Sequence, residues 1–449
     1  MSGLPARAAA FAFALTTLAS AAYAQARPET FTLRNGMQVV VITDRRAPVV
    51  THQVWYRVGA ADEPRGRSGI AHFLEHLLFK GTDRIAQGEF SRTIARNGGD
   101  DNAQTSWDYT AYYERIARER LELVMTMEAD RMRNARITEE VIASERDVII
   151  EERRQRIDNN PGQVLGERMR AMLYPNHPYG TPIIGWLHEM RGLTRQDALD
   201  FYQIYYAPNN AILVVAGDVD AAELRPLAER IYGRVRPTRN LPARTWVQDP
   251  PPVGPMRVTH RDERVRQPSV SRLYPALSHT TDEGTEAHAL DVAIEVLGGS
   301  ETSRLYRILV EERRLAVAAG ASADTAGRGG GSISVYATPA PNVTLESLEA
   351  AMDEVIGAYL REGPTQIEIE RARNNIAASA IYARDSQENL AFWYGSSLAE
   401  GESLDDIVNW ADRIRAVSRE EALAMARRTL VTANSVTGWL LPSETAAGQ

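Results

Sequence analysis

The stretch "RSGIAHFLEHLLFKGT", residues 67–82, combines a buried helix face with three ionisable side chains. Its apolar residues recur at the spacing of one helix face, at Ile70, Phe73, Leu74, Leu77 and Leu78. Because successive residues of a helix are about 100° apart, His72, Glu75 and His76 share a narrow second stripe beside this face. Ionisable groups beside a core are unfavourable unless something pairs with them, so the pattern indicates a partner.

A metal ion is the partner that this spacing favours. Two imidazoles one helical turn apart can both reach a single cation, and the Glu75 carboxylate can reach a water molecule on that cation. The order H-x-x-E-H is the inverted form of the zinc-binding helix of metallopeptidases. The alternative is a helix that carries two surface histidines and a glutamate by chance. With 8 histidines in 449 residues this spacing is uncommon, but a third ligand is still required.

The third ligand is predicted in "TEEVIASERDVIIEERRQRID", residues 138–158, which have the caps and pattern of a helix. The helical wheel places an apolar stripe at Val141, Val148 and Ile149. It places Glu145 and Glu152 inside that stripe and Glu151 near its edge. Since a buried carboxylate without a cation is unfavourable, Glu152 is the predicted ligand and Glu145 its supporting neighbour. The alternative is that both glutamates pair with nearby arginines.

Composition limits the protein to a few classes. The chain has 449 residues, of which 44% are hydrophobic, and is long enough for two or more domains with proper cores. Cysteine is absent, so any metal site must be built from His, Asp and Glu. The formal net charge of −8 disfavours nucleic acid as the main partner.

The N-terminus predicts a secretory signal peptide over residues 1–24. Arg7 precedes an apolar run, residues 8–22, and a small-x-small site ends at Ala24 with cleavage before Gln25. The alternative, an uncleaved membrane anchor, needs about 20 strongly apolar residues, and this run is shorter and mostly Ala. Removal takes away one Arg and no acidic residue, so the net charge changes from −8 to −9. We expect a periplasmic or secreted protein without stable membrane insertion.

A proline-rich segment, "RPTRNLPARTWVQDPPPVGPM", residues 236–256, is the clearest break in the chain. It separates a predicted N-terminal domain, residues 25–235, from a predicted C-terminal domain, residues 257–449. Each half closes with an apolar strand led by an asparagine, and Asn210 and Asn434 are 224 residues apart. This similarity indicates a duplicated unit.

The order of strands and helices predicts an α+β fold. Segments with alternating apolar residues predict strands, and segments with helical periodicity predict helices at 67–80, 116–134 and 138–158. We therefore expect two homologous domains, each a mostly antiparallel sheet with helices packed on one face. The glycine-rich segment 327–332 lacks the Lys-Ser/Thr of a phosphate loop and predicts a hairpin turn.

Five segments together resemble the M16 zinc metallopeptidases, the pitrilysin and insulinase family. They are "GIAHFLEHLLFKGT", "GGDDNAQTSWDYTAYY", "ERDVIIEERRQRIDNNP", "HPYG" and "YYAPNNAILVVAGDVD". The length is similar to that of the short subfamily that includes the mitochondrial processing peptidase β subunit and bacterial periplasmic two-subunit homologues. The resemblance implies a fold that forms half of a clam-shell chamber.

The resemblance also assigns roles within the site. It implies one Zn²⁺ per chain, held by His72, His76 and Glu152, with Glu75 as the catalytic base of an endopeptidase that cleaves unfolded or short peptides. In the family the strand that matches Asn102, Ala103 and Gln104 borders the cleft and pairs with the substrate backbone, so these three residues are substrate-contact candidates.

The second half departs from the family pattern at two positions. "GGSETSRLYRILVEERRLAVAAG", residues 298–320, resembles a family segment in which an Arg and a Tyr help to hold the substrate, but Val310 and Val317 stand there in this chain. Some members of the short subfamily divide the work, with a related subunit supplying the opposing half. The resemblance thus implies a homologous partner that carries the Arg and Tyr, with a homodimer as an alternative. Another alternative is a non-catalytic assembly or scaffold subunit, and a third is simple drift at the two valines.

Overall fold

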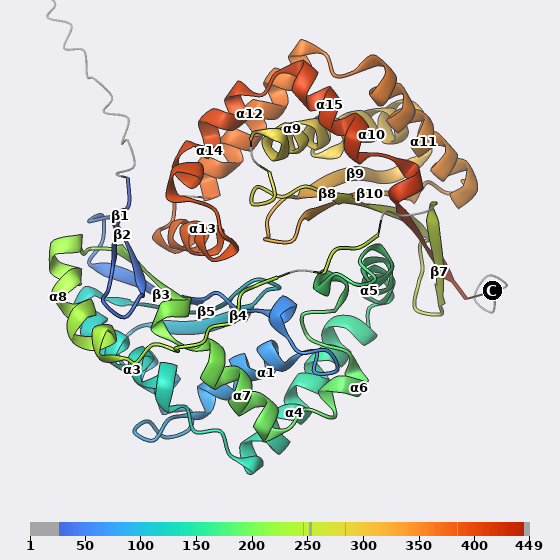
Figure 1. The fold of residues 1–449 in the computed structure, drawn as a ribbon. Helices are drawn as coiled ribbons and strands as arrows, with labels where there is room; N and C mark the ends of the chain where they lie inside the picture. The colour runs from blue at the N-terminus through green and yellow to red at the C-terminus, as the bar shows by residue number, and fades with distance from the viewer. Residues whose placement is uncertain (1–26, 246, 251–253, 283, 384, 444–449) are drawn as a thin grey trace, which may run out of the picture.

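The computed structural model describes residues 27–443, except 246, 251–253, 283 and 384. The predicted signal peptide therefore lies outside the described residues, as does part of the proline-rich segment. The described chain forms two sheets, each with its own helices (Figure 1). None of the described helices combines the length and apolar character needed to cross a membrane.

The first sheet has six strands in the order β1-β2-β6-β3-β5-β4. Neighbouring strands are antiparallel except β2 and β6, which are parallel. β4 is an edge strand, as the sequence predicts for the strand after Gly98 and Gly99. The strands are β1 (Glu29–Thr32), β2 (Gln38–Thr43), β3 (Val49–Tyr56), β4 (Asp100–Thr105), β5 (Thr110–Ala117) and β6 (Ala211–Gly217).

The helices of the first half pack mainly on one face of this sheet, around a core that includes the apolar stripe of α1. The predicted helix over 116–134 begins only at Leu121, because β5 continues to Ala117. The predicted helix over 138–158 is α-helical to Arg153 and ends in a π-helical turn. The helices are α1 (Ile70–Leu77), α2 (Glu89–Arg96), α3 (Leu121–Asn134), α4 (Glu139–Arg153), α5 (Pro161–Leu173), α6 (Leu187–Met190), α7 (Arg195–Tyr205) and α8 (Ala221–Ile231).

The second sheet has five strands in the order β7-β11-β8-β10-β9. Its strands are β7 (Met256–Asp262), β8 (Ser269–Ala276), β9 (Ala316–Asp324), β10 (Gly331–Pro339) and β11 (Val436–Pro442). Its helices are α9 (Glu286–Gly298), α10 (Arg304–Tyr306), α11 (Leu345–Glu362), α12 (Gln366–Ala383), α13 (Gln387–Glu400), α14 (Leu404–Ala416) and α15 (Arg419–Thr429). The glycine-rich segment forms the turn between β9 and β10, so that prediction is confirmed.

The two sheets repeat one topology. The order β2-β6-β3-β5-β4 matches β7-β11-β8-β10-β9 strand for strand, and in both the last strand of the half is parallel to the first strand of that set. β6 and β11 each follow a 3-10 turn that ends at Asn210 or Asn434. The predicted α+β fold with two homologous units is confirmed.

Each half covers a sheet of the other half with one helix. α13 packs its apolar side chains on the second face of the first sheet, against residues such as Trp55 and Val214. α5 packs Leu165 and Met169 against β7, β8 and β11 of the second sheet. Figure 1 shows α13 over the strands of the first sheet and α5 beside the second. Because both contacts are buried and apolar, they fix the two halves relative to each other.

The contact of α13 with the first sheet depends on a glycine. A Cβ at Gly395 would lie 2.2 Å from the ring of Trp55, which is fully buried. Gly395→Ala should therefore lower the free energy of unfolding by about 1 to 3 kcal/mol, because the core cannot accommodate the extra methyl group. Chemical denaturation of the purified chain measures this loss.

The matched control is Gly166→Ala in α5, where an added Cβ meets nothing within 4 Å. This variant should be as stable as the parent or more stable, by up to about 1 kcal/mol, because Ala is the better helix former. Equal stability of the two variants would contradict the proposed contact.

Candidate metal centre

The start of α1 is held by two carboxylates from outside the helix. Glu63 accepts hydrogen bonds from the backbone N–H groups of Gly69, at 2.8 Å, and Ala71, at 2.9 Å. Glu189 accepts one from the N–H of Ser68, at 2.7 Å. Gly69 has a φ of 86°, which glycine adopts without strain. These bonds satisfy N–H groups that a helix start leaves free, and they fix the direction of the helix.

Three side chains from α1 and α4 converge in the cleft. The Nε2 atom of His72 lies 3.4 Å from Oε2 of Glu152, and the Nε2 atom of His76 lies 3.3 Å from the same oxygen. Within the described part of the chain, this is the one group of three or more His, Asp or Glu residues whose ligand atoms lie close enough to hold a metal ion. Oε2 of Glu152 is buried and has no hydrogen-bond partner. The arrangement suits a cation between the three atoms, and two imidazoles with a carboxylate are a donor set typical of zinc.

Glu145 supports this group from about two turns earlier on α4. Its Oε1 atom lies 3.5 Å from Nδ1 of His76, and its Oε2 atom is paired with the ammonium of Lys80. The second oxygen of Glu152 is paired with Arg156 at 2.9 Å. Both carboxylates are thus fixed in direction, as are many carboxylates that hold or support a metal ligand.

Burial and the neighbouring charges shift the pKa values of the two imidazoles in opposite directions. Burial, with a contribution from His76, lowers the pKa of His72 to about 4, so that ring is neutral and able to bind a metal. Burial also disfavours the charged form of His76, but the adjacent carboxylates of Glu145 and Glu152 raise its pKa to about 9. A proton on His76 and a metal ion compete for the same nitrogen, so acid conditions disfavour metal binding.

Glu75 lies beside this group and is fixed by the edge strand β4. The Oγ1 atom of Thr105 donates a hydrogen bond of 2.5 Å to Oε2 of Glu75. Burial raises the pKa of the Glu75 carboxyl, and the bond from Thr105 opposes that rise. A carboxylate held in this way can accept a proton at one oxygen while the other stays hydrogen-bonded.

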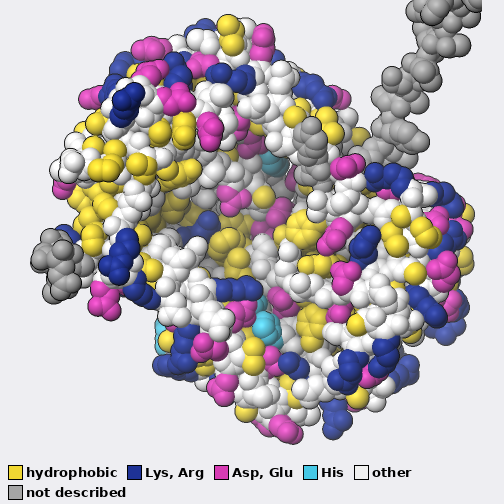
Figure 2. Space-filling view, turned by 180° about the vertical axis from the view of Figure 1, so that it is seen from behind, with side chains coloured by type: hydrophobic (Ala, Val, Ile, Leu, Met, Phe, Trp, Pro, Cys, Tyr) yellow, Lys and Arg dark blue, Asp and Glu magenta, His cyan; other side chains and the backbone are white. Residues whose placement is uncertain are grey.

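The cleft that contains these residues runs between the two halves. It has a volume of about 950 Å³ and is lined by His72, Glu75, His76 and Glu152 together with the predicted substrate-contact residues Asn102, Ala103 and Gln104. The opposite wall comes from the second sheet, at Leu273, Ser322, Asp324, Ser332 and Ser334. Figure 2 shows the hollow between the halves, with histidine side chains inside it. The structure thus brings the predicted ligands, the predicted base and the predicted substrate-contact residues into one cleft, and Glu145 contacts His76 from outside the lining of that cleft.

The helical-wheel prediction for α4 was wrong at one position. Val148 is 48% exposed, whereas the buried face consists of Ile142, Glu145, Ile149 and Arg153. The face is rotated because the Arg153 guanidinium is buried, where it donates hydrogen bonds to Glu167 and to the carbonyl of Gly185. The side chain of Glu151 is 54% exposed and pairs with Arg154, so it points away from the cleft.

Several residues of the site carry no sequence signal of their own. Thr105, Glu63 and Glu189 come from other segments that the fold brings to α1, and Lys80, which directly follows α1, meets Glu145 of α4 only in the folded chain. Thr105 belongs to the strand already singled out, which is the one signal that could have found it.

The two valines of the second half lie apart from the cleft. Val317 is 47% exposed on β9, and Val310 packs against the second core. Neither is among the described residues that line the cleft.

Comparison with known proteins identifies the family of this fold and cleft. Residues 38–186 match the model for Insulinase (Peptidase family M16), and residues 192–376 match the model for the Peptidase M16 inactive domain. The chain therefore belongs to peptidase family M16.

Individual relatives agree with this assignment. The chain is 30% identical over 395 residues to the zinc protease PqqE of Helicobacter pylori, and the match covers 86% of this chain and 88% of that protein. It is similar to the crystal structure of a protease from Helicobacter pylori, with a TM-score of 0.86, 28% identity and coverage of 92% of this chain and 99% of that one. It shares its fold with the periplasmic protease PqqL of Escherichia coli, with a TM-score of 0.79 and 18% identity over 94% of this chain and 48% of that one.

Proposed function

We propose that this protein is a zinc-dependent endopeptidase that cleaves unfolded or short peptides. The observation that carries the proposal is the convergence of His72, His76 and Glu152 on one point beside Glu75. Three protein ligands leave a fourth position open, which distinguishes catalytic from structural zinc sites. When bound, the zinc ion supplies acidity to a water molecule and polarises the peptide carbonyl.

The chain's own residues perform the remaining steps. Glu75 takes the proton from the attacking water and then gives it to the leaving amine. Thr105 holds one oxygen of Glu75 so that the other faces the reacting atoms. The free edge of β4, at Asn102, Ala103 and Gln104, orients the peptide by pairing with its backbone.

Replacement of the proposed base, Glu75, tests its role in peptide hydrolysis independently of metal binding. Glu75→Gln should retain zinc but lose at least about 100-fold of the peptide hydrolysis, because an amide cannot take up the proton. Metal analysis and cleavage of an unstructured peptide measure the two properties. Near-normal cleavage by this variant would end the role proposed for Glu75.

Replacement of the proposed third ligand tests the zinc site itself. Glu152→Ala should leave the purified protein with little zinc, because the two imidazoles alone form an incomplete site. Glu151→Ala is the matched control and should retain zinc, since this neighbouring side chain is exposed. Loss of zinc from the control but not from Glu152→Ala would refute the assignment.

We further propose that the protein is exported and works with a homologous subunit. Residues 1–24 carry the signal-peptide pattern, and the units 25–235 and 257–449, joined by the segment 236–256, supply one half of a chamber. The chain covers 48% of the length of PqqL, which leaves room for a second half. A non-catalytic scaffold subunit is the second candidate function, because Val310 and Val317 replace the Arg and Tyr of the family pattern.

The partner proposal predicts low activity of the isolated chain. Two absent polar contacts to the transition state correspond to roughly 2 to 6 kcal/mol, which is well over tenfold in rate. Cleavage of an unstructured peptide should therefore rise by at least about tenfold when a related subunit with the Arg and Tyr is co-expressed. Full activity of a monomer or homodimer, unchanged by that subunit, would contradict the proposal.

A further inference from the structure

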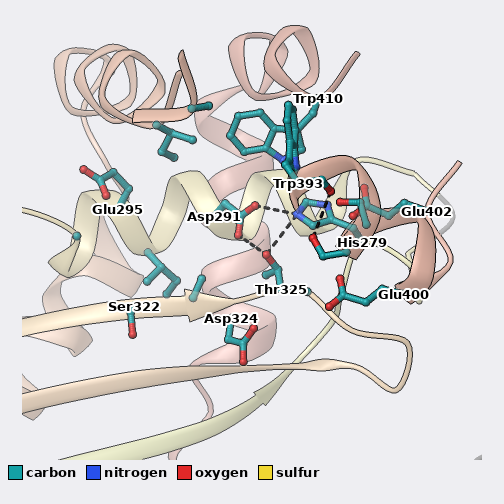
Figure 3. Close-up of a pocket in the computed structure, with 18 of the residues that line it drawn as sticks. His279, Asp291, Glu295, Ser322, Asp324, Thr325, Trp393, Glu400, Glu402 and Trp410 are labelled. Atoms are coloured by element: carbon teal, nitrogen blue, oxygen red, sulfur yellow. Dashed lines mark hydrogen bonds and ion pairs between the residues drawn. The ribbon is translucent and has the colours of Figure 1, made fainter. Parts of the chain in front are cut away.

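The second half contains a cavity of about 830 Å³ between β9 and the helices α9, α12, α13 and α14 (Figure 3). Five carboxylates line it: Asp291, Glu295, Asp324, Glu400 and Glu402. Four aromatic side chains also line it: Tyr109, Phe392, Trp393 and Trp410. No Lys or Arg is found among the described lining residues. The walls of this acidic cavity therefore combine negative charge with aromatic rings.

Glu400 is the most unusual of these carboxylates. It is 8% exposed, and in Figure 3 its carboxylate points into the acidic cavity. It accepts a hydrogen bond from the backbone N–H of Gly327, and no described side chain donates to it or pairs with it. Burial, together with the charges of Asp108 and Glu402, raises its pKa to about 8. This raised pKa keeps the carboxyl largely protonated near neutral pH, and a cation inside the cavity favours its charged form.

One ring nitrogen of a histidine on the wall of the acidic cavity also lacks a hydrogen-bond partner. Nε2 of His279 lies 3.1 Å from Oδ2 of Asp291. The other ring nitrogen, Nδ1, is buried and has no hydrogen-bond partner. Two groups of this wall thus have unused capacity for a ligand: Glu400 is bonded only to a backbone N–H, and Nδ1 of His279 has no hydrogen-bond partner in the described chain.

The acidic cavity occupies the place in the second half that the metal centre occupies in the first. α9 packs against the edge strand β9 and against α12, as α1 packs against the edge strand β4 and against α4. Asp291 and Glu295 are four residues apart on α9, as His72 and His76 are on α1. Asn375 of α12 donates a hydrogen bond of 3.1 Å to Glu295 of α9, so a polar contact joins these two helices as the contact between Glu152 and His76 joins α4 and α1.

The chemistry at this second place differs from that of the metal centre. The acidic cavity has carboxylates where the metal centre has imidazoles, and its groups do not approach one another as metal ligands do among the described residues. A cavity of this size with aromatic walls has room for an organic cation rather than a bare metal ion.

The acidic cavity and the catalytic cleft share a wall. Ser322 and Asp324 of β9 line both. A peptide that lies along the cleft can therefore place a side chain in the acidic cavity while another part of its backbone lies at the metal centre.

We propose that the acidic cavity binds the side chain of an arginine or lysine of the peptide substrate, at a position remote from the cleaved bond. The carboxylates of Glu400 and Glu402 pair with the cationic group, and the indole rings of Trp393 and Trp410, which pack edge to face, form an aromatic wall beside it. Arginine fits better than lysine, because its planar guanidinium can stack on the rings and bind a carboxylate with two hydrogen bonds. The inference rests on the proposed function only in taking a peptide as the ligand.

The experiment measures binding without turnover. The zinc-loaded Glu75→Gln chain is titrated into fluorescent, N-acetylated peptides with one arginine at successive positions, and each is compared with the same peptide carrying citrulline, a neutral group of the same shape. Fluorescence anisotropy reports the affinity. For at least one position the arginine peptide should bind at least about tenfold more tightly. Glu400→Gln or Glu402→Gln, added separately, should reduce this ratio to less than about threefold and leave zinc content and citrulline binding unchanged.

The matched control is Glu420→Gln, an exposed carboxylate on α15 outside the cavity, which should leave the ratio unchanged. Equal affinity for arginine and citrulline peptides at every position would overturn the proposal. A preference that survives both cavity variants, or no measurable peptide binding, would also overturn it. An arginine preference in this assay, together with no hydrolysis by the unaltered chain either alone or with the related subunit that carries the Arg and Tyr, would refute the proposed peptidase function and leave the cation site intact.

Discussion

The candidate metal centre of the first half depends on one constraint: a buried carboxylate between two imidazoles needs a positively charged partner. The Nε2 atoms of His72 and His76 each lie within 3.4 Å of one carboxylate oxygen of Glu152 at the wall of a cleft, and this oxygen has no hydrogen-bond partner. Such an arrangement is stable when a cation joins the three atoms and unfavourable when it is empty. The surrounding contacts keep it in place, because Glu63 and Glu189 fix the start of α1 while Glu145 and Thr105 fix the side chains beside it.

The cleft lies between two halves whose relative position is fixed by buried apolar contacts. α13 completes the core on the second face of the first sheet, and α5 covers the second sheet. Because each half covers the sheet of the other half with one helix, β9 and β10 lie opposite the metal centre and the cleft has a wall from each half. A polar contact strengthens this arrangement, since Asp108 of the first half accepts hydrogen bonds from the hydroxyl of Tyr179 and the backbone N–H of Arg328.

Duplication gave the chain two equivalent places for chemistry. In the first half the helix beside the edge strand carries imidazoles, and in the second half the equivalent helix carries carboxylates. The same backbone therefore supports a site suited to a metal ion and a cavity suited to an organic cation. Both lie beside an edge strand, and Ser322 and Asp324 of β9 line both the acidic cavity and the cleft.

The sequence by itself determined the α+β class and the repeat, and it singled out the residues that converge at the candidate metal centre. Helical and strand periodicity are local, and the spacing of His72, Glu75 and His76 on one turn already implies a shared direction. The pattern of α4 was less informative, because a wheel based on apolar residues could not show that Arg153 is buried and Val148 exposed.

Only the tertiary structure decided which distant residues complete the site. Thr105 meets Glu75 through pairing of strands, and Lys80 meets Glu145 through packing of α1 against α4. The acidic cavity was equally invisible in the sequence, because its carboxylates are scattered from residue 291 to residue 402. Isolated acidic residues are common on protein surfaces, and only the fold shows which of them are buried together without a cation.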